Sequence, residues 1–197
     1  MNTITLKGII KNIQYSHTVK DIEYNKATLI VPRNNGKEDV ISLKFKKFSN
    51  RYKENDEIEL TGNIRSYSSK SDSNKNKVDI HVFTYFDLPD GNEEIINQFE
   101  LDGRICKKDI LRKTSSGKEH CQFILANNII TSNTKLNCYL PCVIWGKNAV
   151  KFDEEFKVGD EIKIKGQLHS REYTKYFEDG SCEFRIAYEL LVQEYEK

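Results

Sequence analysis

Short segments in which apolar and polar residues alternate constrain this chain more than any other feature. In the first half they lie at residues 4–10, 27–31, 41–45, 58–64 and 78–82, with polar stretches between them. A period of two is typical of β-strands that bury one face and expose the other. Five such strands within residues 1–88 predict a small all-β domain.

The second half repeats the plan of the first. The string Asp-Glu-Ile-x-(Ile/Leu)-x-Gly stands at residues 56–62 and again at 160–166. A repeat of this length indicates two copies of one domain. Between the copies, Pro89 and Gly91 mark a turn-rich stretch. We therefore expect a first domain at residues 1–88, a linker at 89–97 and a second domain at 98–197.

One helical segment interrupts the strands of the second half. Ala149, Phe152 and Phe156 are spaced as on one face of a helix over residues 148–156, after the third strand. Five strands with a helix after the third is the order of the OB-fold, a small barrel. The sequence thus predicts an all-β protein of two tandem OB-folds, each a five-stranded Greek-key barrel, with one short helix in the second. The matching segment of the first half, residues 48–52, is shorter and less helical.

Composition excludes several classes of protein. The 31 Lys and Arg residues nearly balance the 30 Asp and Glu residues, which excludes a polycation but not a local basic face. No stretch approaches the roughly 18 apolar residues of a membrane helix, and the N-terminus lacks the pattern of a signal peptide, so no membrane partner is expected. Five scattered cysteines, an odd number, favour a reduced, cytoplasmic protein.

The third strand of the second half, residues 138–145, separates two kinds of side chain. One face is apolar and suits a barrel interior, and it carries Cys138, Leu140, Cys142 and Ile144. The opposite face carries Tyr139, Pro141, Val143 and Trp145. Aromatic rings outside an OB barrel suit stacking of nucleic-acid bases. Tyr139 and Trp145 are therefore candidate base-stacking residues, and the alternative is burial against the neighbouring domain or a subunit.

The fourth strand and the loop after it add cations and further rings. Ile162, Ile164, Gly166 and Leu168 are expected to point inward, which leaves Lys163, Lys165, Gln167 and His169 outside. Two lysines and a histidine on one outer face suit a track for phosphates, or are an ordinary solvated face. The loop at 171–182 contributes Arg171, Tyr173, Tyr176 and Phe177, which favour a clamp for single strands. Phe177 could equally fold back on the barrel.

The first half offers fewer such residues. Phe45 shares an apolar face with Ile41 and Leu43, which places it in the core, and the outer face carries lysines without a ring. The polar loop at 66–77 is expected to be flexible and contains only Tyr67 as an aromatic. Strand-face placement therefore favours the second half as the binding domain, and the first half as a pairing or structural domain.

Two other chemistries are disfavoured. The carboxylates fall mostly in turns and on outer faces, without a pair placed for acid–base catalysis, so an enzyme is not expected. Cys138 and Cys142 lie in one strand about 13 Å apart, too far to share a zinc ion or to form a disulfide. We expect no metal and no cofactor.

Three strings of the second half resemble the bacterial single-stranded DNA-binding protein family. They stand at residues 116–126, 139–147 and 157–173, and the resemblance runs from about 99 to 194. It implies an OB-fold that winds single-stranded DNA around its surface without strong sequence preference, in replication, recombination or repair. By position, Tyr139, Trp145 and Tyr173 match the base-stacking aromatics of that family, and Lys147 and Arg171 match its phosphate-contacting cations.

The chain also departs from the usual pattern of that family. It carries two domains, and four OB domains per assembly would then require a homodimer. Residues 193–197 lack the acidic tip that recruits partner enzymes, which puts that route in doubt. The alternative function is an OB-fold protein–protein interaction module, of the kind used in primosome assembly, without direct DNA binding. RNA as the ligand is a further variant.

Overall fold

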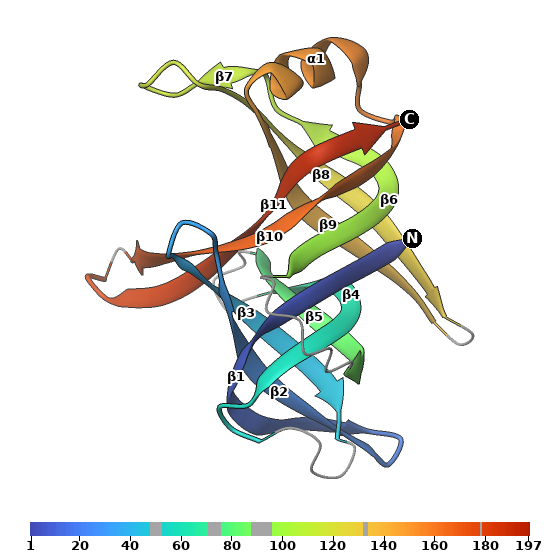
Figure 1. The fold of residues 1–197 in the computed structure, drawn as a ribbon, viewed down its shortest axis with the longest axis vertical. Helices are drawn as coiled ribbons and strands as arrows, with labels where there is room; N and C mark the ends of the chain where they lie inside the picture. The colour runs from blue at the N-terminus through green and yellow to red at the C-terminus, as the bar shows by residue number, and fades with distance from the viewer. Residues whose placement is uncertain (48–52, 71–75, 88–95, 132–133, 178) are drawn as a thin grey trace.

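The computed structural model describes the chain except residues 48–52, 71–75, 88–95, 132–133 and 178 (Figure 1). Eleven strands and one helix lie within the described residues, and no described helix is long and apolar enough to cross a membrane. Their bounds are β1 (Asn2–Val19), β2 (Ile22–Pro32), β3 (Glu38–Lys46), β4 (Glu57–Lys70), β5 (Asn76–Asp87), β6 (Asn97–Lys108), β7 (Arg112–Lys113), β8 (Glu119–Thr131), β9 (Thr134–Trp145), α1 (Lys147–Glu155), β10 (Glu161–Tyr176) and β11 (Cys182–Glu196).

Both halves close into barrels of the same topology. In the N-terminal barrel β1 pairs antiparallel with β2 and β4, and a parallel contact of β3 with β5 closes the sheet. In the C-terminal barrel β6 pairs with β8 and β10, and a parallel contact of β9 with β11 closes it. The helix α1 lies between β9 and β10, so the predicted tandem OB-folds are confirmed. The two-residue β7, which pairs with β8, is an addition to the five strands expected in the second half.

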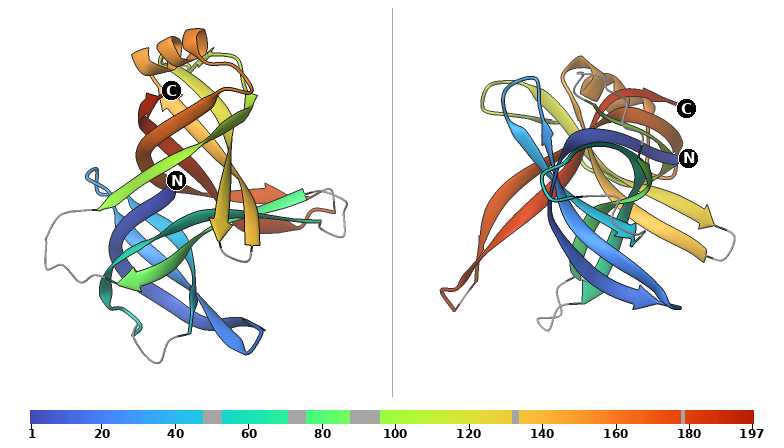
Figure 2. Two further views of the ribbon diagram at one scale, coloured as in Figure 1. Left: turned by 90° about the vertical axis from the view of Figure 1, so that its right-hand side faces the viewer. Right: turned by 60° about the horizontal axis from the view of Figure 1, so that its bottom comes forward.

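The two barrels share one continuous sheet. β1 and β6 pair antiparallel, with Asn2 opposite Leu101 and Thr5 opposite Gln98, and they run side by side in Figures 1 and 2. The fully buried Asn127 of β8 accepts a hydrogen bond from Asn2 Nδ2 at 2.7 Å. These contacts join the halves through backbone pairing. The predicted linker lies largely outside the described residues, and the domain bounds stay a prediction.

The barrel interiors follow the predicted alternation. Cys138, Leu140, Cys142 and Ile144 are all buried, and Phe45 belongs to the N-terminal core. The inward face of α1 closes the end of the C-terminal barrel, where the Phe152 ring lies 4.8 Å from Phe123 and 5.6 Å from Tyr195 between centroids. Aromatic pairs at these separations stabilise a core beyond the area that they bury.

Glycines stand where neighbouring strands approach most closely. A Cβ atom on Gly166 would lie 1.9 Å from the carbonyl oxygen of Leu191, and one on Gly8 would lie 2.3 Å from that of Ile30. Real side chains do not fit at such distances, so these positions require glycine. At these glycines the backbones of neighbouring strands are therefore in close contact.

Three expectations need correction. Val143, assigned to the outer face, is fully buried; its register partners Gln122 of β8 and Leu191 of β11 stand on the same face of the sheet beside it. The loop expected at 66–77 is a hairpin in which β4 continues to Lys70 and β5 starts at Asn76. The loop expected at 171–182 is likewise strand up to Tyr176 and again from Cys182. Polar residues misled both loop predictions, because strands that extend beyond a barrel need no apolar face. The segment at 48–52 lies outside the described residues.

Candidate nucleic-acid interface

The outer face of β9 carries two rings, Tyr139 in the middle of the strand and Trp145 at its C-terminal end. Tyr139 is 52% exposed, and Trp145 is half-buried. They are six positions apart along the strand, which is about 20 Å. The Trp145 ring lies 4.9 Å from the His120 ring, and Lys118 Nζ lies 5.1 Å from its centroid. Trp145 is therefore held in place by an aromatic neighbour and a cation while part of it stays accessible.

Lys147 follows Trp145 by two positions along the chain. It is exposed at the first position of α1, directly after Gly146, whose φ of 66° turns the chain from β9 into the helix. Only Gly146 separates Lys147 from Trp145 along the chain. Pairing of a ring with a nearby cation is what single-strand binding requires, because bases stack and phosphates are neutralised.

Around Tyr139 and Pro141, in the middle of its length, β9 borders a large groove between the two barrels. This junction groove has a volume of about 920 Å³. Its apolar lining comes from both halves of the chain and includes Val78, Ile80, Ile124, Tyr139, Pro141, Tyr173, Phe184 and Ile186. The structure thus brings Tyr139 and Tyr173 together in one groove, although they are far apart in sequence.

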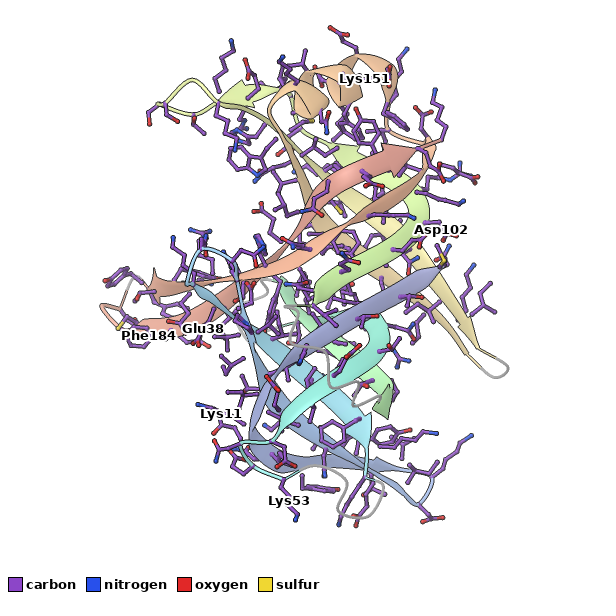
Figure 3. All side chains as sticks on the ribbon, in the orientation of Figure 1. Lys11, Glu38, Lys53, Asp102, Lys151 and Phe184 are labelled. Carbon is purple, nitrogen blue, oxygen red and sulfur yellow. The ribbon has the colours of Figure 1, made fainter. Side chains whose placement is uncertain are left out.

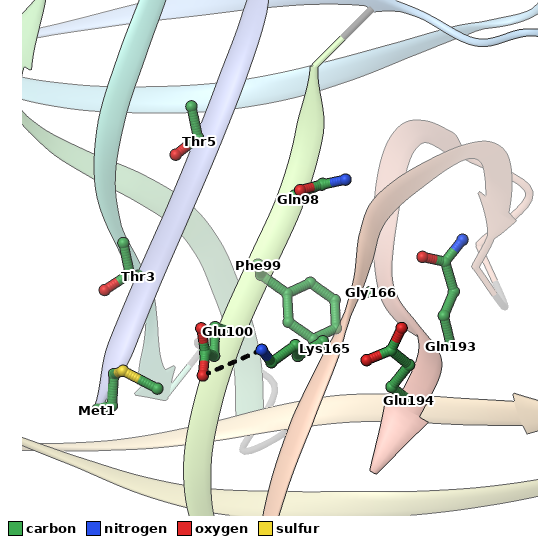
Figure 4. Close-up of a pocket in the computed structure, with 10 residues that line it drawn as sticks. All are labelled: Met1, Thr3, Thr5, Gln98, Phe99, Glu100, Lys165, Gly166, Gln193 and Glu194. Atoms are coloured by element: carbon green, nitrogen blue, oxygen red, sulfur yellow. Dashed lines mark ion pairs between the residues drawn. The ribbon is translucent and has the colours of Figure 1, made fainter.

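Lys163 and Lys165 lie elsewhere, on the ladder that β10 forms with β6. Lys165 Nζ lies 3.6 Å from Glu100 and lines a separate hollow of about 360 Å³ at the β1–β6 seam (Figure 4). Lys163 Nζ lies 3.3 Å from Glu196. Neither lysine lines the junction groove. Both are exposed and paired with carboxylates, so they offer less free charge than the sequence suggested.

His169 and Arg171 differ in their surroundings. His169 is half-buried, and burial lowers its pKa below 6.5, with Arg33 acting in the same direction and Asp39 opposing it. The ring is therefore neutral at neutral pH and can offer a hydrogen bond but no charge to a phosphate. Arg171 is exposed on β10, two residues before Tyr173. Of these two candidates, only Arg171 presents a positive charge at the surface.

The hairpin of β10 and β11 extends away from the barrels (Figure 2). Tyr176 is 77% exposed near its tip. The Phe177 ring lies 5.0 Å from Lys175 Nζ and 5.8 Å from Arg185 Cζ, so it packs on its own hairpin, one of the two placements left open. Arg185 lies opposite Tyr173 and donates hydrogen bonds to the Glu183 carboxylate at 2.9 and 2.6 Å. The hairpin therefore interleaves rings and cations.

Sequence reasoning missed one prominent ring. Phe184 is 84% exposed, the most exposed of the large apolar side chains described, and Figure 3 shows it at the extended hairpin. The alternation of Phe184, Ile186 and Tyr188 could have indicated it, had the last strand been expected to start as early as Cys182. Lys107, whose side chain is 70% exposed, also lines the groove and was not predicted.

The described residues contain no cluster of three or more side chains able to hold a metal ion. Cys138 and Cys142 are both buried, and burial raises the pKa of the Cys142 thiol far above its ordinary value. A thiol in that state is neither a ready metal ligand nor a nucleophile.

Fold and site together define the class of an OB-fold protein with a candidate aromatic and cationic nucleic-acid interface. Residues 96–196, half of the chain, match the single-strand binding protein family, and the chain belongs to that family. This membership confirms the resemblance drawn from the sequence and supports the prediction of a protein that binds single-stranded DNA. Family and fold are those of binding proteins.

Individual proteins are similar to this chain over different spans. The replication restart protein PriB of Erwinia tasmaniensis is 28% identical over 80 residues, 39% of this chain and 76% of that protein. PriB of Klebsiella pneumoniae is 27% identical over 74 residues, 36% of this chain and 71% of that protein. The crystal structure of the wild-type single-stranded DNA binding protein from Thermus aquaticus matches this chain with a TM-score of 0.74 and 17% identity. The match covers 100% of this chain and 92% of the Thermus aquaticus chain. The last likeness concerns the fold.

Proposed function

We propose that the C-terminal barrel binds single-stranded DNA by stacking bases on Trp145, Tyr139 and Tyr173, without strong sequence preference. The observation that carries this proposal is the outer face of β9, where the accessible rings of Trp145 and Tyr139 lie on one strand and Tyr139 opens into a groove shared with Tyr173. Stacking contributes about 1–3 kcal/mol per base and tolerates any sequence, because every base has a flat face.

Phosphates would follow the cations near these rings. Lys147 and Arg171 are the first contacts, since both are exposed. Lys163 and Lys165 would exchange their glutamate partners for phosphates, which is feasible because exposed ion pairs contribute only about 0–1 kcal/mol. Tyr176 and Phe177 would contact DNA from the hairpin, and His169 by a hydrogen bond.

The biological setting of the proposal is DNA replication, with recombination and repair as related processes. Its relatives include replication restart proteins and its fold is that of a single-stranded DNA binding protein. We propose a cytoplasmic protein without enzymatic activity that assembles as a homodimer, so that four OB barrels act together.

The test is a titration of the intact protein with fluorescent oligothymidine of about 30 nucleotides, enough for two OB-folds at roughly 4–16 nucleotides each. Fluorescence of Trp145, the only tryptophan, is followed in parallel at several salt concentrations. We expect binding that weakens with salt and quenches Trp145, with matched duplex binding far less. Absence of binding at low salt would contradict the proposal.

A protein–protein interaction module is the second candidate. It is favoured by the similarity to PriB, a replication restart protein, over 80 residues. The two functions separate in the same titration, because a module that contacts only protein leaves Trp145 fluorescence unchanged when DNA is added. Oligouridine of equal length tests the RNA variant.

A further inference from the structure

We propose that the junction groove is itself a binding site for unstacked bases, with the N-terminal barrel as one wall and Phe184 as an additional stacking platform. The inference rests on the proposed function and extends it, because it gives the N-terminal barrel a direct part in binding. It also assigns a role to the most exposed ring among the described apolar residues.

The first wall is a core face of the N-terminal barrel that continues into solvent. Ile80 and Val78 lie on the same face of β5, two residues apart. Ile80 is 6% exposed inside the barrel, whereas Val78 is 53% exposed where the β4–β5 hairpin extends past it. Both line the junction groove. The hairpin therefore presents apolar surface that its own barrel does not bury.

The second wall is built in the same way by the C-terminal barrel. Leu190, Tyr188, Ile186 and Phe184 share one face of β11. Exposure rises along this face from 0% at Leu190 to 38% at Ile186 and 84% at Phe184. The apolar faces of β5 and β11, each of which continues from a barrel core into solvent, thus line one groove together with Tyr139 and Pro141 of β9.

Hydrogen bonds between the barrels hold these walls in place. The Tyr139 backbone N–H donates to Ser66 Oγ of β4 at 2.7 Å, which ties the N-terminal hairpin to β9. Tyr188 accepts a hydrogen bond from the Ser42 N–H at 3.0 Å and donates one to the Val40 carbonyl at 3.1 Å, which ties β11 to β3. The groove is therefore formed before any ligand arrives, so a ligand does not have to order it.

Single-stranded DNA is the occupant that the chemistry favours. Tyr139 belongs both to the groove and to the β9 face that leads to Trp145, so a strand stacked on β9 runs directly into the groove. The two carboxylates that line the groove are neutralised, because Asp79 is paired with Lys44 and Glu183 is paired with Arg185. Lys107, whose Nζ lies 3.4 Å from the Asp109 carboxylate, also lines the groove and could exchange that partner for a phosphate. Bases would enter the apolar interior while phosphates remain outside.

Val78→Glu tests the N-terminal wall, because it places a carboxylate where bases would lie. The matched control is Val19→Glu, at a valine of similar exposure (48%) on the β1–β2 hairpin, away from the groove. We expect Val78→Glu to weaken binding of the oligothymidine about tenfold, in line with the loss of one stacked base. Val19→Glu should bind as the unmodified protein does. Circular dichroism verifies the fold of both variants.

Cys106 supplies an independent readout. It is exposed and lines the groove, whereas Cys182 is exposed at the start of β11 outside it, and the other three cysteines are buried. We expect bound oligothymidine to slow alkylation of Cys106 by iodoacetamide more than that of Cys182.

The outcomes separate this proposal from the function on which it rests. If Trp145→Ala weakens binding while Val78→Glu does not and Cys106 stays reactive, the groove proposal is wrong and the function stands. If only Val78→Glu is without effect, the N-terminal wall takes no part. Shielding of Cys106 that depends on protein concentration and not on DNA would assign the groove to a second copy of the chain. A protein that does not bind the oligomer at all overturns both.

Discussion

At the scale of single residues, Gly166 allows β10 and β11 to approach more closely than any residue with a side chain would permit. A Cβ atom there would lie 1.9 Å from a backbone carbonyl oxygen and 3.1 Å from the Phe99 ring. The strand register between β10 and β11 shifts at this point, between Lys165 and Gly166. Neither neighbour is the end of a flexible side chain, so the backbone itself has to move.

Gly166→Ala is therefore expected to lower the free energy of unfolding by about 2–4 kcal/mol, as overpacking of a core does. Gly180→Ala is the matched control, because nothing lies within 4 Å of its Cβ position and only its φ of 81° opposes the change. The control should cost about 1–2 kcal/mol. Urea unfolding of both variants measures the difference, and equal losses would contradict the close contact.

His81 provides a residue-scale prediction for pH. It is 8% exposed, and burial lowers its pKa below the ordinary 6.5, while the Asp79 carboxylate at 3.6 Å opposes the shift. The unfolded chain then binds a proton more readily than the folded one. The stability from the neutral ring is present above about pH 6.5 and is lost as the pH falls toward the folded-state value.

We expect the free energy of unfolding to decrease as the pH is lowered below 6.5, and the His81→Gln variant to show a shallower decrease. His169, whose pKa is lowered in the same direction, accounts for part of the slope that remains. Urea titrations at several pH values measure how the free energy of unfolding depends on pH in both proteins. An identical slope in the variant would show that His81 takes no part.

At the scale of elements, β3 and β10 are joined by a buried ionic cluster. The Asp39 side chain is fully buried and accepts hydrogen bonds from Arg33 Nε at 2.8 Å and from the Ser170 backbone N–H at 2.5 Å. Ser170 in turn accepts one from the Val40 N–H at 2.7 Å. One carboxylate thus organises donors from both barrels.

Asp39→Ala should lower the free energy of unfolding by about 3–5 kcal/mol, because it leaves a guanidinium group and an N–H without their acceptor. Glu23→Ala is the control, since its pair with Lys47 is about half exposed on both sides and is worth only about 0–1 kcal/mol. Thermal unfolding compares them, and a small effect at Asp39 would mean that water replaces the carboxylate.

At the scale of the whole molecule, the two barrels are one structural unit rather than two linked ones. The β1–β6 ladder carries the sheet from one barrel into the other, and the Asp39, Tyr188 and Asn127 contacts cross the same boundary. Cooperative unfolding is expected when so many contacts span a junction.

We therefore predict a single unfolding transition in urea. Trp145 fluorescence reports on the C-terminal barrel and far-ultraviolet circular dichroism on all strands, so their midpoints should coincide. In Asp39→Ala the two midpoints should move apart as the junction weakens. Two separate transitions in the unmodified protein would show that the barrels are independent.

Much of the fold and part of the site could be predicted from the sequence, for a common physical reason. Alternation along β9 placed Cys138 and Ile144 inside and Tyr139 outside, because a strand in a barrel has one buried face. Val143 broke the rule, since it is fully buried beside its cross-strand neighbours at a position that alternation leaves outside. Phe184 was missed because polar neighbours hid a strand that extends beyond the barrel.

The sequence by itself determined the two OB barrels, the position of the single helix and the membership in the single-strand binding family. These follow from local periodicity and short strings, which are properties of neighbouring residues. Only the tertiary structure decided that Tyr139 and Tyr173 share a groove with Val78, and that Lys163 and Lys165 lie apart from it. Such pairings depend on how strands twist and cross between barrels, and no local pattern specifies contacts between residues so distant along the chain.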